Sequence, residues 1–138
     1  MSELDEVRYP SGCAVVSGGL IAGNDTVSGG ASGGLSRGSA IAGGGMWMGV
    51  SELPAGYRSN PHHHEGQTTM VCVISGSMDF IVTVPNGDEE RFNVGPGQIA
   101  LVPGGLVHRE ENNGDQGCLS VVVRNSEHPT VVNLTESA

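Results

Sequence analysis

Three consecutive histidines are the residues of this chain best suited to metal chemistry. They are His62, His63 and His64, in the segment GYRSNPHHHEGQTTMVCVISG. If residues 58–64 form a strand, successive side chains alternate between its two faces, so His62 and His64 share one face and His63 takes the other. Two imidazoles on one face can reach a single ion, so a third ligand must come from elsewhere.

The third ligand is predicted to be His108. It stands at the start of a predicted strand, directly after the tight turn VPGG, which would fix it on a rigid element. His128, in the sequence SEHPT, is predicted to be a solvated loop residue. Imidazole suits Fe, Zn, Ni and Cu alike, so His62, His64 and His108 predict a site for one divalent transition metal.

The composition excludes several other classes of function. The chain of 138 residues has six basic residues, all arginine, against fifteen acidic ones, for a net charge of -9. Without a basic stripe, nucleic acid is not an expected partner. The N-terminus MSELDEV is acidic where a signal peptide is basic, and no apolar run approaches a membrane span. We therefore expect a cytoplasmic protein without membrane segments, whose three cysteines are buried, reduced thiols.

The elements that must position the histidines are predicted to be strands. From residue 46 onward, short apolar runs alternate with turn signals at the spacing typical of a sandwich or barrel, and no segment has a helical period. We expect one all-β domain with a glycine-rich arm over 1–45, a barrel core over 46–125 and a tail over 126–138. The predicted core strands are 46–53, 58–64, 69–75, 78–84, 90–93, 99–102, 107–111 and 119–124. Within the arm, short strands are expected around 14–16 and 35–42.

The two histidine segments together resemble the two motifs of the cupin superfamily. The residues that follow the first motif, G-x5-H-x-H-x(3,4)-E-x6-G, are Gly56, His62, His64 and Gly76. The residues that match all of the second, G-x5-P-x-G-x2-H-x3-N, are Gly97, Pro103, Gly105, His108 and Asn112. The resemblance implies a double-stranded β-helix, also called a jelly-roll barrel, with a metal held inside it. It also implies a homodimer built through N-terminal strands.

The glutamate of the first motif is missing from this sequence. By count it falls at Thr68 or Thr69, and neither is a usual metal ligand. Gln67 and Glu65 could replace it only if the loop shifts register, and Gln67 needs the smaller shift. Glu110 is another candidate, because it lies two residues beyond the third histidine and so on the same face of its strand. The simplest outcome is a three-histidine site with open positions, the layout of catalytic rather than structural sites.

The resemblance also suggests where the substrate pocket lies. If position 68 faces the barrel interior, as the motif glutamate would, alternation places Met70 and Cys72 on the cavity wall. Trp47 and Met48, on the strand before the first motif, are predicted to add an apolar wall for a small substrate. No base is visible beside Cys72, so a packed thiol is expected rather than a nucleophile.

Three classes of function remain open at this level. Three-histidine cupins of this size resemble small non-haem iron dioxygenases, which implies a metal-dependent oxidoreductase with Fe(II) and a small organic substrate. Zn, Ni, Cu or Mn are alternative ions, and the missing carboxylate argues against Mn. The same scaffold carries lyases, isomerases and cyclases in which the ion is a Lewis acid, and also non-catalytic binding modules.

Overall fold

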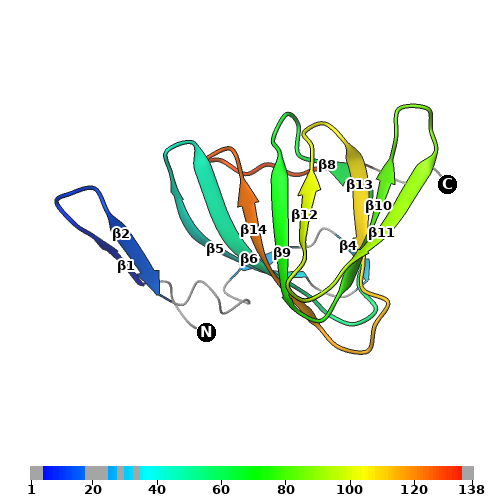
Figure 1. Cartoon of the computed structure of the whole chain (residues 1–138), viewed down its shortest axis with the longest axis horizontal. Helices are drawn as coiled ribbons and strands as arrows, with labels where there is room; N and C mark the ends of the chain where they lie inside the picture. The colour runs from blue at the N-terminus through cyan, green and yellow to red at the C-terminus, as the bar shows by residue number, and fades with distance from the viewer. Residues whose placement is uncertain (1–4, 18–24, 28–29, 33–34, 135–138) are drawn as a thin grey trace.

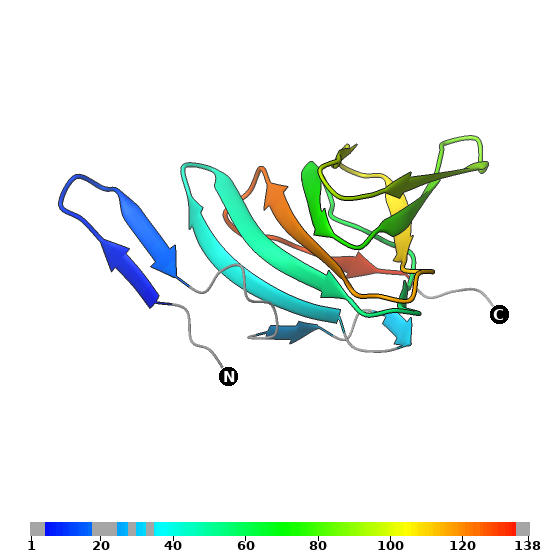
Figure 2. The ribbon, with the colours of Figure 1, turned by 60° about the horizontal axis from the view of Figure 1, so that its bottom comes forward.

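Figure 1 shows the chain as a computed structural model, which describes residues 5–17, 25–27, 30–32 and 35–134. Every regular element in these residues is a strand, which confirms the predicted all-β class. Two sheets face each other as a jelly-roll-like barrel, and a hairpin projects beside it (Figure 2). Within the described ranges, no helix is long and apolar enough to cross a membrane.

The first sheet carries two of the three predicted histidine ligands. Its strand order is β11 (Glu89–Val94), β10 (Met78–Thr83), β13 (Val107–Glu111), β7 (Arg58–Ser59) and β4 (Gly30–Ser32). The short strand β8 (His62–His63) pairs with β13 on one side and with β15 (Val132–Asn133) on the other. The β8–β13 register sets His62 directly opposite His108. This pairing brings the two sequence motifs together.

The second sheet contains part of the glycine-rich segment. Its order is β12 (Ile99–Val102), β9 (Thr69–Ser75), β14 (Cys118–Arg124), β6 (Met46–Leu53), β5 (Leu35–Gly43) and β3 (Asp25–Val27). Since β5 pairs with β6 along most of its length, residues 35–43 extend the barrel wall. The projecting hairpin consists of β1 (Asp5–Arg8) and β2 (Ala14–Ser17). The predicted arm also supplies β4 to the first sheet, and its residues 1–4, 18–24, 28–29 and 33–34 lie outside the described residues.

The strand predicted over 58–64 is broken in two. Strands β7 and β8 flank Asn60 and Pro61, which belong to no strand. Proline lacks the N–H that a sheet ladder needs, so pairing stops there and resumes with the histidines. The strands predicted over 46–53, 69–75, 99–102 and 107–111 have the predicted bounds.

The core lies between the two sheets and consists of aliphatic and aromatic side chains. Phe80, Leu53 and Val73 are among its most deeply buried members. Cys118 belongs to the same cluster, and burial raises the pKa of its thiol to about 11, so it is neutral at physiological pH. The three cysteines are free thiols, as predicted, but the prediction that all are buried is wrong, because Cys13 is exposed and Cys72 is only partly buried.

Two glycines let distant backbones approach closely. Gly76 has a φ of +74°, and a Cβ there would collide with the backbone of Gly117. At Gly104, a Cβ would lie 2.5 Å from the carbonyl oxygen of Gly66. A side chain at either position would force the backbones apart. The Gly104 contact joins the loop that follows His64 to the turn before His108.

Candidate metal centre

The structure brings His62, His64 and His108 together. One ring nitrogen of each lies within 4.8 Å of the others, and all three side chains are buried. His63 points away, and its Nδ1 accepts a hydrogen bond of 3.0 Å from the backbone N–H of Glu65. The structure therefore agrees with the alternation expected from the sequence, in which His62 and His64 share one face and His63 takes the other.

Backbone carbonyl groups fix the orientation of all three imidazoles. A carbonyl oxygen only accepts hydrogen bonds, so each Nδ1 carries a proton, and each Nε2 presents a lone pair when its ring is neutral. The Nδ1–H groups donate to Asn60 at 2.8 Å for His62, to Thr130 at 2.8 Å for His64 and to Leu106 at 3.1 Å for His108. The Nε2 atoms are therefore left as three converging nitrogen donors.

The protonation of the histidines suits metal binding. Burial, reinforced by the positive charge of Arg124, lowers the pKa of His64 to about 3. Burial likewise lowers the pKa of His108. For His62, burial lowers the pKa, but the charge and hydrogen bond of Glu110 outweigh it and the net shift is upward. Two of the three ligands are thus neutral at physiological pH without any ion.

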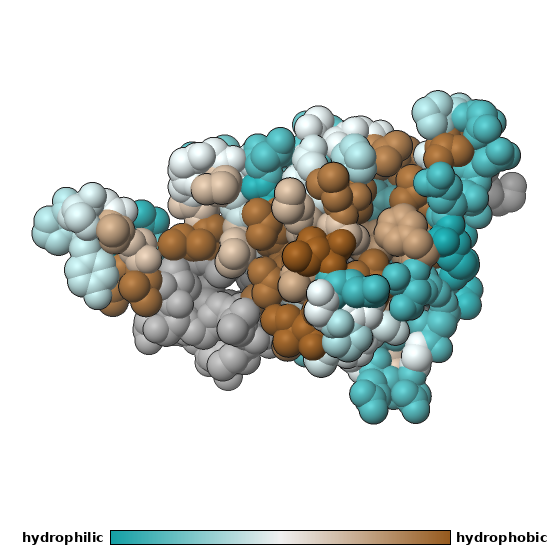
Figure 3. All heavy atoms as spheres, viewed as in Figure 1, coloured by the Kyte–Doolittle hydropathy of each residue, from teal (hydrophilic) through white to brown (hydrophobic). Residues whose placement is uncertain are grey.

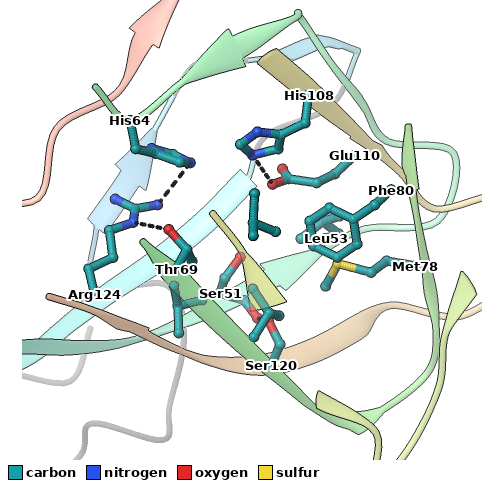
Figure 4. Close-up of a pocket in the computed structure, with 13 residues that line it drawn as sticks. Ser51, Leu53, His64, Thr69, Met78, Phe80, His108, Glu110, Ser120 and Arg124 are labelled. Atoms are coloured by element: carbon teal, nitrogen blue, oxygen red, sulfur yellow. Dashed lines mark hydrogen bonds and ion pairs between the residues drawn. The ribbon is translucent and has the colours of Figure 1, made fainter. Parts of the chain in front are cut away.

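A carboxylate completes the cluster. Oε1 of Glu110 lies 3.6 Å from Nε2 of His62 and 3.7 Å from Nε2 of His108. Burial alone would raise the pKa of Glu110. The charge and hydrogen bond of the adjacent His62 outweigh burial, so the net pKa is lowered and the carboxylate is ionised. Figure 4 shows Glu110 directed toward His108 inside the barrel.

These donors fit a divalent transition ion. Three imidazole nitrogens and a carboxylate oxygen suit iron, manganese, zinc and nickel. Ligands about 2.1 Å from one ion lie roughly 3 to 4 Å apart, so side-chain shifts on the order of 1 Å would bring this set together.

The position of the missing motif glutamate is occupied by Thr69. Its side chain is buried, and Oγ1 accepts a hydrogen bond of 3.1 Å from Nε of Arg124. The NH2 group of Arg124 lies 3.4 Å from Nε2 of His64, and its guanidinium lies 5.6 Å from the ring centroid of Trp47. The six-residue spacing to Gly76 in the motif distinguishes Thr69 from Thr68. A threonine bound to a buried arginine therefore replaces the carboxylate that the motif predicts.

Gln67 does not face the histidines. Its Nε2 donates to the carbonyl of His128 at 2.9 Å, and its Oε1 accepts from the N–H of Thr130 at 3.2 Å. The prediction of Gln67 as a fourth ligand is thus wrong, because its amide binds the backbone of a distant segment instead. Of the three fourth-ligand candidates, Glu110 alone lies at the cluster, since Glu65 is exposed to solvent.

The cluster opens into a small cavity between the sheets (Figure 4). Its volume is about 30 Å³, so its enclosed part accommodates only a few atoms. The polar lining residues are Ser51, His64, Thr69, His108, Glu110, Ser120 and Arg124. The apolar ones are Leu53, Val71, Met78, Phe80, Val102 and Val122.

The four predicted pocket residues do not line this cavity. Met70 is half exposed and Cys72 lies on the same outer face of β9, whereas Thr69 and Val71 face inward. The predicted alternation is correct, but the prediction assumes that Thr68 faces the cavity, whereas Thr69 is the threonine that does. Trp47 and Met48 instead border a groove of about 320 Å³ beside the β1–β2 hairpin.

Sequence reasoning missed Arg124 altogether. The strand predicted over 119–124 already indicated its position, because alternation places Ser120, Val122 and Arg124 on one face of that strand. An arginine on the inward face of a buried strand is rare unless it has partners. That rarity could have identified it as a site residue.

Comparisons with known proteins agree with this geometry. Germin-like protein 1-3 of Oryza sativa subsp. japonica is 34% identical over 87 residues, which cover 59% of this chain and 39% of that protein. Germin-like protein subfamily T member 3 of Arabidopsis thaliana is 33% identical over 85 residues, covering 62% and 37%. The chain thus spans well under half the length of these relatives.

Solved structures share the fold. An oxalate oxidase in complex with the substrate analogue glycolate superposes with a TM-score of 0.70 at 20% identity, covering 86% of this chain and 62% of that one. The S161A mutant of the Bacillus subtilis oxalate decarboxylase superposes with a TM-score of 0.65 at 19% identity, covering 80% and 30%. The sequence profile of the cupin domain matches residues 49–124, more than half of the chain. The protein therefore belongs to the cupin family.

Proposed function

We propose that this protein is a metal-dependent oxidoreductase that acts on a small organic acid. The observation that carries the proposal is that three oriented histidine nitrogens lie close together beside the Glu110 carboxylate, next to a cavity that His64, His108 and Glu110 line. The shared fold of a solved oxalate oxidase, an oxidoreductase of a small organic acid, supports the same reaction class. The cavity of about 30 Å³ favours an acid of few atoms.

In this proposal His62, His64, His108 and Glu110 hold the ion. A bound Fe(II) or Mn(II) would supply a Lewis acid and a redox centre. The absence of the motif glutamate argues against manganese only if no other carboxylate is present, and Glu110 supplies one. Leu53, Phe80 and the other apolar lining residues help to exclude water from the cavity.

The site tolerates an anionic substrate because Arg124 adds a positive charge beside the histidines. Its charge opposes protonation of all three histidines, although Glu110 makes the net pKa shift of His62 upward, so its field reaches the whole cluster. With a divalent ion, the charges of Arg124 and Glu110 cancel and the centre keeps two net positive charges. A carboxylate is the substrate group that such a centre favours.

The test is metal content followed by oxygen uptake. Protein purified without an affinity tag is supplemented with Fe(II), Mn(II) or Zn(II), dialysed, and analysed for bound metal. We expect one ion per chain, and oxygen consumption with small mono- or dicarboxylates in the Fe(II) or Mn(II) form. Failure to retain any ion would overturn the proposal. Stoichiometric zinc without oxygen uptake in any form would instead favour a lyase or isomerase that uses the ion only as a Lewis acid.

We also propose that the protein is a homodimer through the outer face of the second sheet. Figure 3 shows apolar side chains gathered on this face. They include Met48, Met70, Ile74, Ile99 and Leu101, each at least 41% exposed. An apolar surface of this kind on a soluble domain indicates an interface. Light scattering after size exclusion should show a dimer that Met70→Glu dissociates, whereas a monomeric parent would contradict the proposal.

A further inference from the structure

We propose that Arg124 binds the carboxylate of the substrate, and that through Arg124 the anion and the metal each strengthen the binding of the other. This inference rests on the proposed function, because it concerns the same site. It adds a residue that lies outside both cupin motifs of this sequence and a thermodynamic coupling between two ligands.

The guanidinium of Arg124 is held in one orientation. The side chain is buried at the end of β14, where Arg124 pairs with Trp47 on β6 and with Thr69 on β9. Nε donates to Oγ1 of Thr69, and the guanidinium lies near the Trp47 ring. These two contacts direct the terminal nitrogen NH2 toward Nε2 of His64, as Figure 4 shows. An arginine fixed in this way loses little entropy when it binds an anion.

Arg124 and a metal ion would compete for the same lone pair. Nδ1 of His64 donates to the carbonyl of Thr130, so Nε2 is its only acceptor, and NH2 of Arg124 lies 3.4 Å from it. An ion that takes this lone pair leaves an N–H donor of Arg124 directed into the cavity without that acceptor. An oxygen atom of a ligand bound beside the ion would be placed to accept from this donor.

Charge makes the coupling positive. A guanidinium and a divalent cation repel each other, and the repulsion is strong in a cavity from which water is largely excluded. A carboxylate between them attracts both, so it removes this cost and binds more tightly when both are present. By thermodynamic linkage, the factor by which the anion tightens metal binding equals the factor by which the metal tightens anion binding.

Glu110 determines on which side the anion binds. Its carboxylate belongs to β13 of the first sheet and lies against His62 and His108, whereas Arg124 belongs to the second sheet. An anionic substrate is repelled by Glu110 and attracted by Arg124. Its carboxylate is therefore expected on the side of His64 and Thr69.

The experiment measures Mn(II) affinity with and without a small carboxylate. Free Mn(II) is quantified by its electron paramagnetic resonance signal, with formate and acetate as probes and chloride as the control anion. Trp47, the single tryptophan of the chain, gives a second readout through its fluorescence, because it stacks on Arg124. In the parent protein, we expect carboxylate to tighten Mn(II) binding about 5- to 100-fold.

The Arg124→Gln variant should lose this coupling. Its Mn(II) affinity without carboxylate should equal or exceed that of the parent, because a repulsive charge is gone, and carboxylate should no longer improve it. Arg124→Lys keeps the charge without the planar fork and should retain part of the coupling. Arg91→Gln, on the outer side of the first sheet, is the matched control and should behave as the parent.

The outcomes separate the two proposals. Full coupling in Arg124→Gln would overturn the role of Arg124 while leaving the metal site intact. A parent protein that binds no Mn(II), Fe(II) or Zn(II) would instead refute the proposed function itself. If circular dichroism shows that Arg124→Gln does not fold, Thr69→Val replaces it. This variant removes the hydrogen bond that orients the guanidinium and should also weaken the coupling.

Discussion

The two sheets bring side chains of opposite charge to one cavity. The first sheet contributes His108 and the carboxylate of Glu110, with His62 beside them, whereas the second contributes Thr69 and the guanidinium of Arg124. Metal ligands thus concentrate on one wall and the cationic group on the other, with His64 in the loop between them. This cupin therefore keeps a carboxylate near its histidines, but the carboxylate lies on the strand of the second motif.

The largest expected effect comes from removing a ligand on the first sheet. His108→Ala should weaken Mn(II) or Fe(II) binding by more than about 100-fold, since altering even the outer partners of metal ligands costs 10- to 100-fold. Isothermal titration calorimetry or metal analysis measures this loss. The matched control is His63→Ala, whose side chain faces away and whose removal should leave the affinity unchanged. Equal losses in both variants would refute the assignment of the ligands.

The next prediction compares Glu110 with Thr69. Glu110→Gln keeps the shape but removes the negative charge, and it should weaken metal binding about 10- to 100-fold. Thr69→Val removes only a hydroxyl that already accepts from Arg124, so metal binding in the absence of carboxylate should change little. If Thr69→Val proved the more damaging change, the ligand role of Glu110 would be wrong.

A third pair of variants distinguishes a change in metal affinity from a change in stability alone. Gly104→Ala and Gly76→Ala should each lower the free energy of unfolding by about 1 to 3 kcal/mol, because each added Cβ meets backbone. Only Gly104→Ala should also weaken metal binding, since it presses on Gly66 in the loop after His64. Chemical denaturation and metal titration measure the two effects. A loss of metal affinity in Gly76→Ala would contradict this separation.

The smallest effect concerns Asp79, on the outer side of the first sheet. Burial raises its pKa, but hydrogen bonds from Asn93 and Asn113 and the charge of Arg91 lower it below its ordinary value of 3.8. A folded pKa below the unfolded one adds stability that is present above about pH 4 and lost as the pH falls further.

Asp79→Asn should therefore make acid unfolding less steep below pH 4. Its cost at neutral pH should be under about 1 kcal/mol, because the group is partly exposed and solvent screens it. Metal binding should stay unchanged. An unaltered acid-unfolding profile, followed by circular dichroism, would show that Asp79 does not contribute in this way.

Much of the fold could be predicted from the sequence because the signals are local. Turn residues and alternating burial define the strands over 46–53 and 69–75, and alternation within PHHHE separates His63 from its neighbours. The complete second motif identifies His108. Pro61 marks the break between β7 and β8, which a prediction weighing the missing N–H would have found.

The remaining errors concern relations between distant segments. The partner of Gln67 is a backbone segment more than sixty residues away, and no local pattern indicates it. Glu110 and Arg124 lie on opposite sides of the cavity because of how the two sheets pack, and this packing follows from the whole topology. The wrong choice between Thr68 and Thr69 moved the predicted pocket to the outer face, since a shift of one residue inverts every side chain of a strand.

The hydrogen bond from His64 to Thr130 differs from those of the other two ligands. His62 and His108 bind carbonyls two residues earlier in their own segments, but Thr130 is 66 residues from His64. The segment around it is secured by Gln67 and by the short strand β15. A protease or a binding partner that lifted residues 128–134 from the barrel would release the orientation of one ligand. In the proposed metal-bound protein, occupancy of the site would thus depend on a surface segment that supplies no ligand.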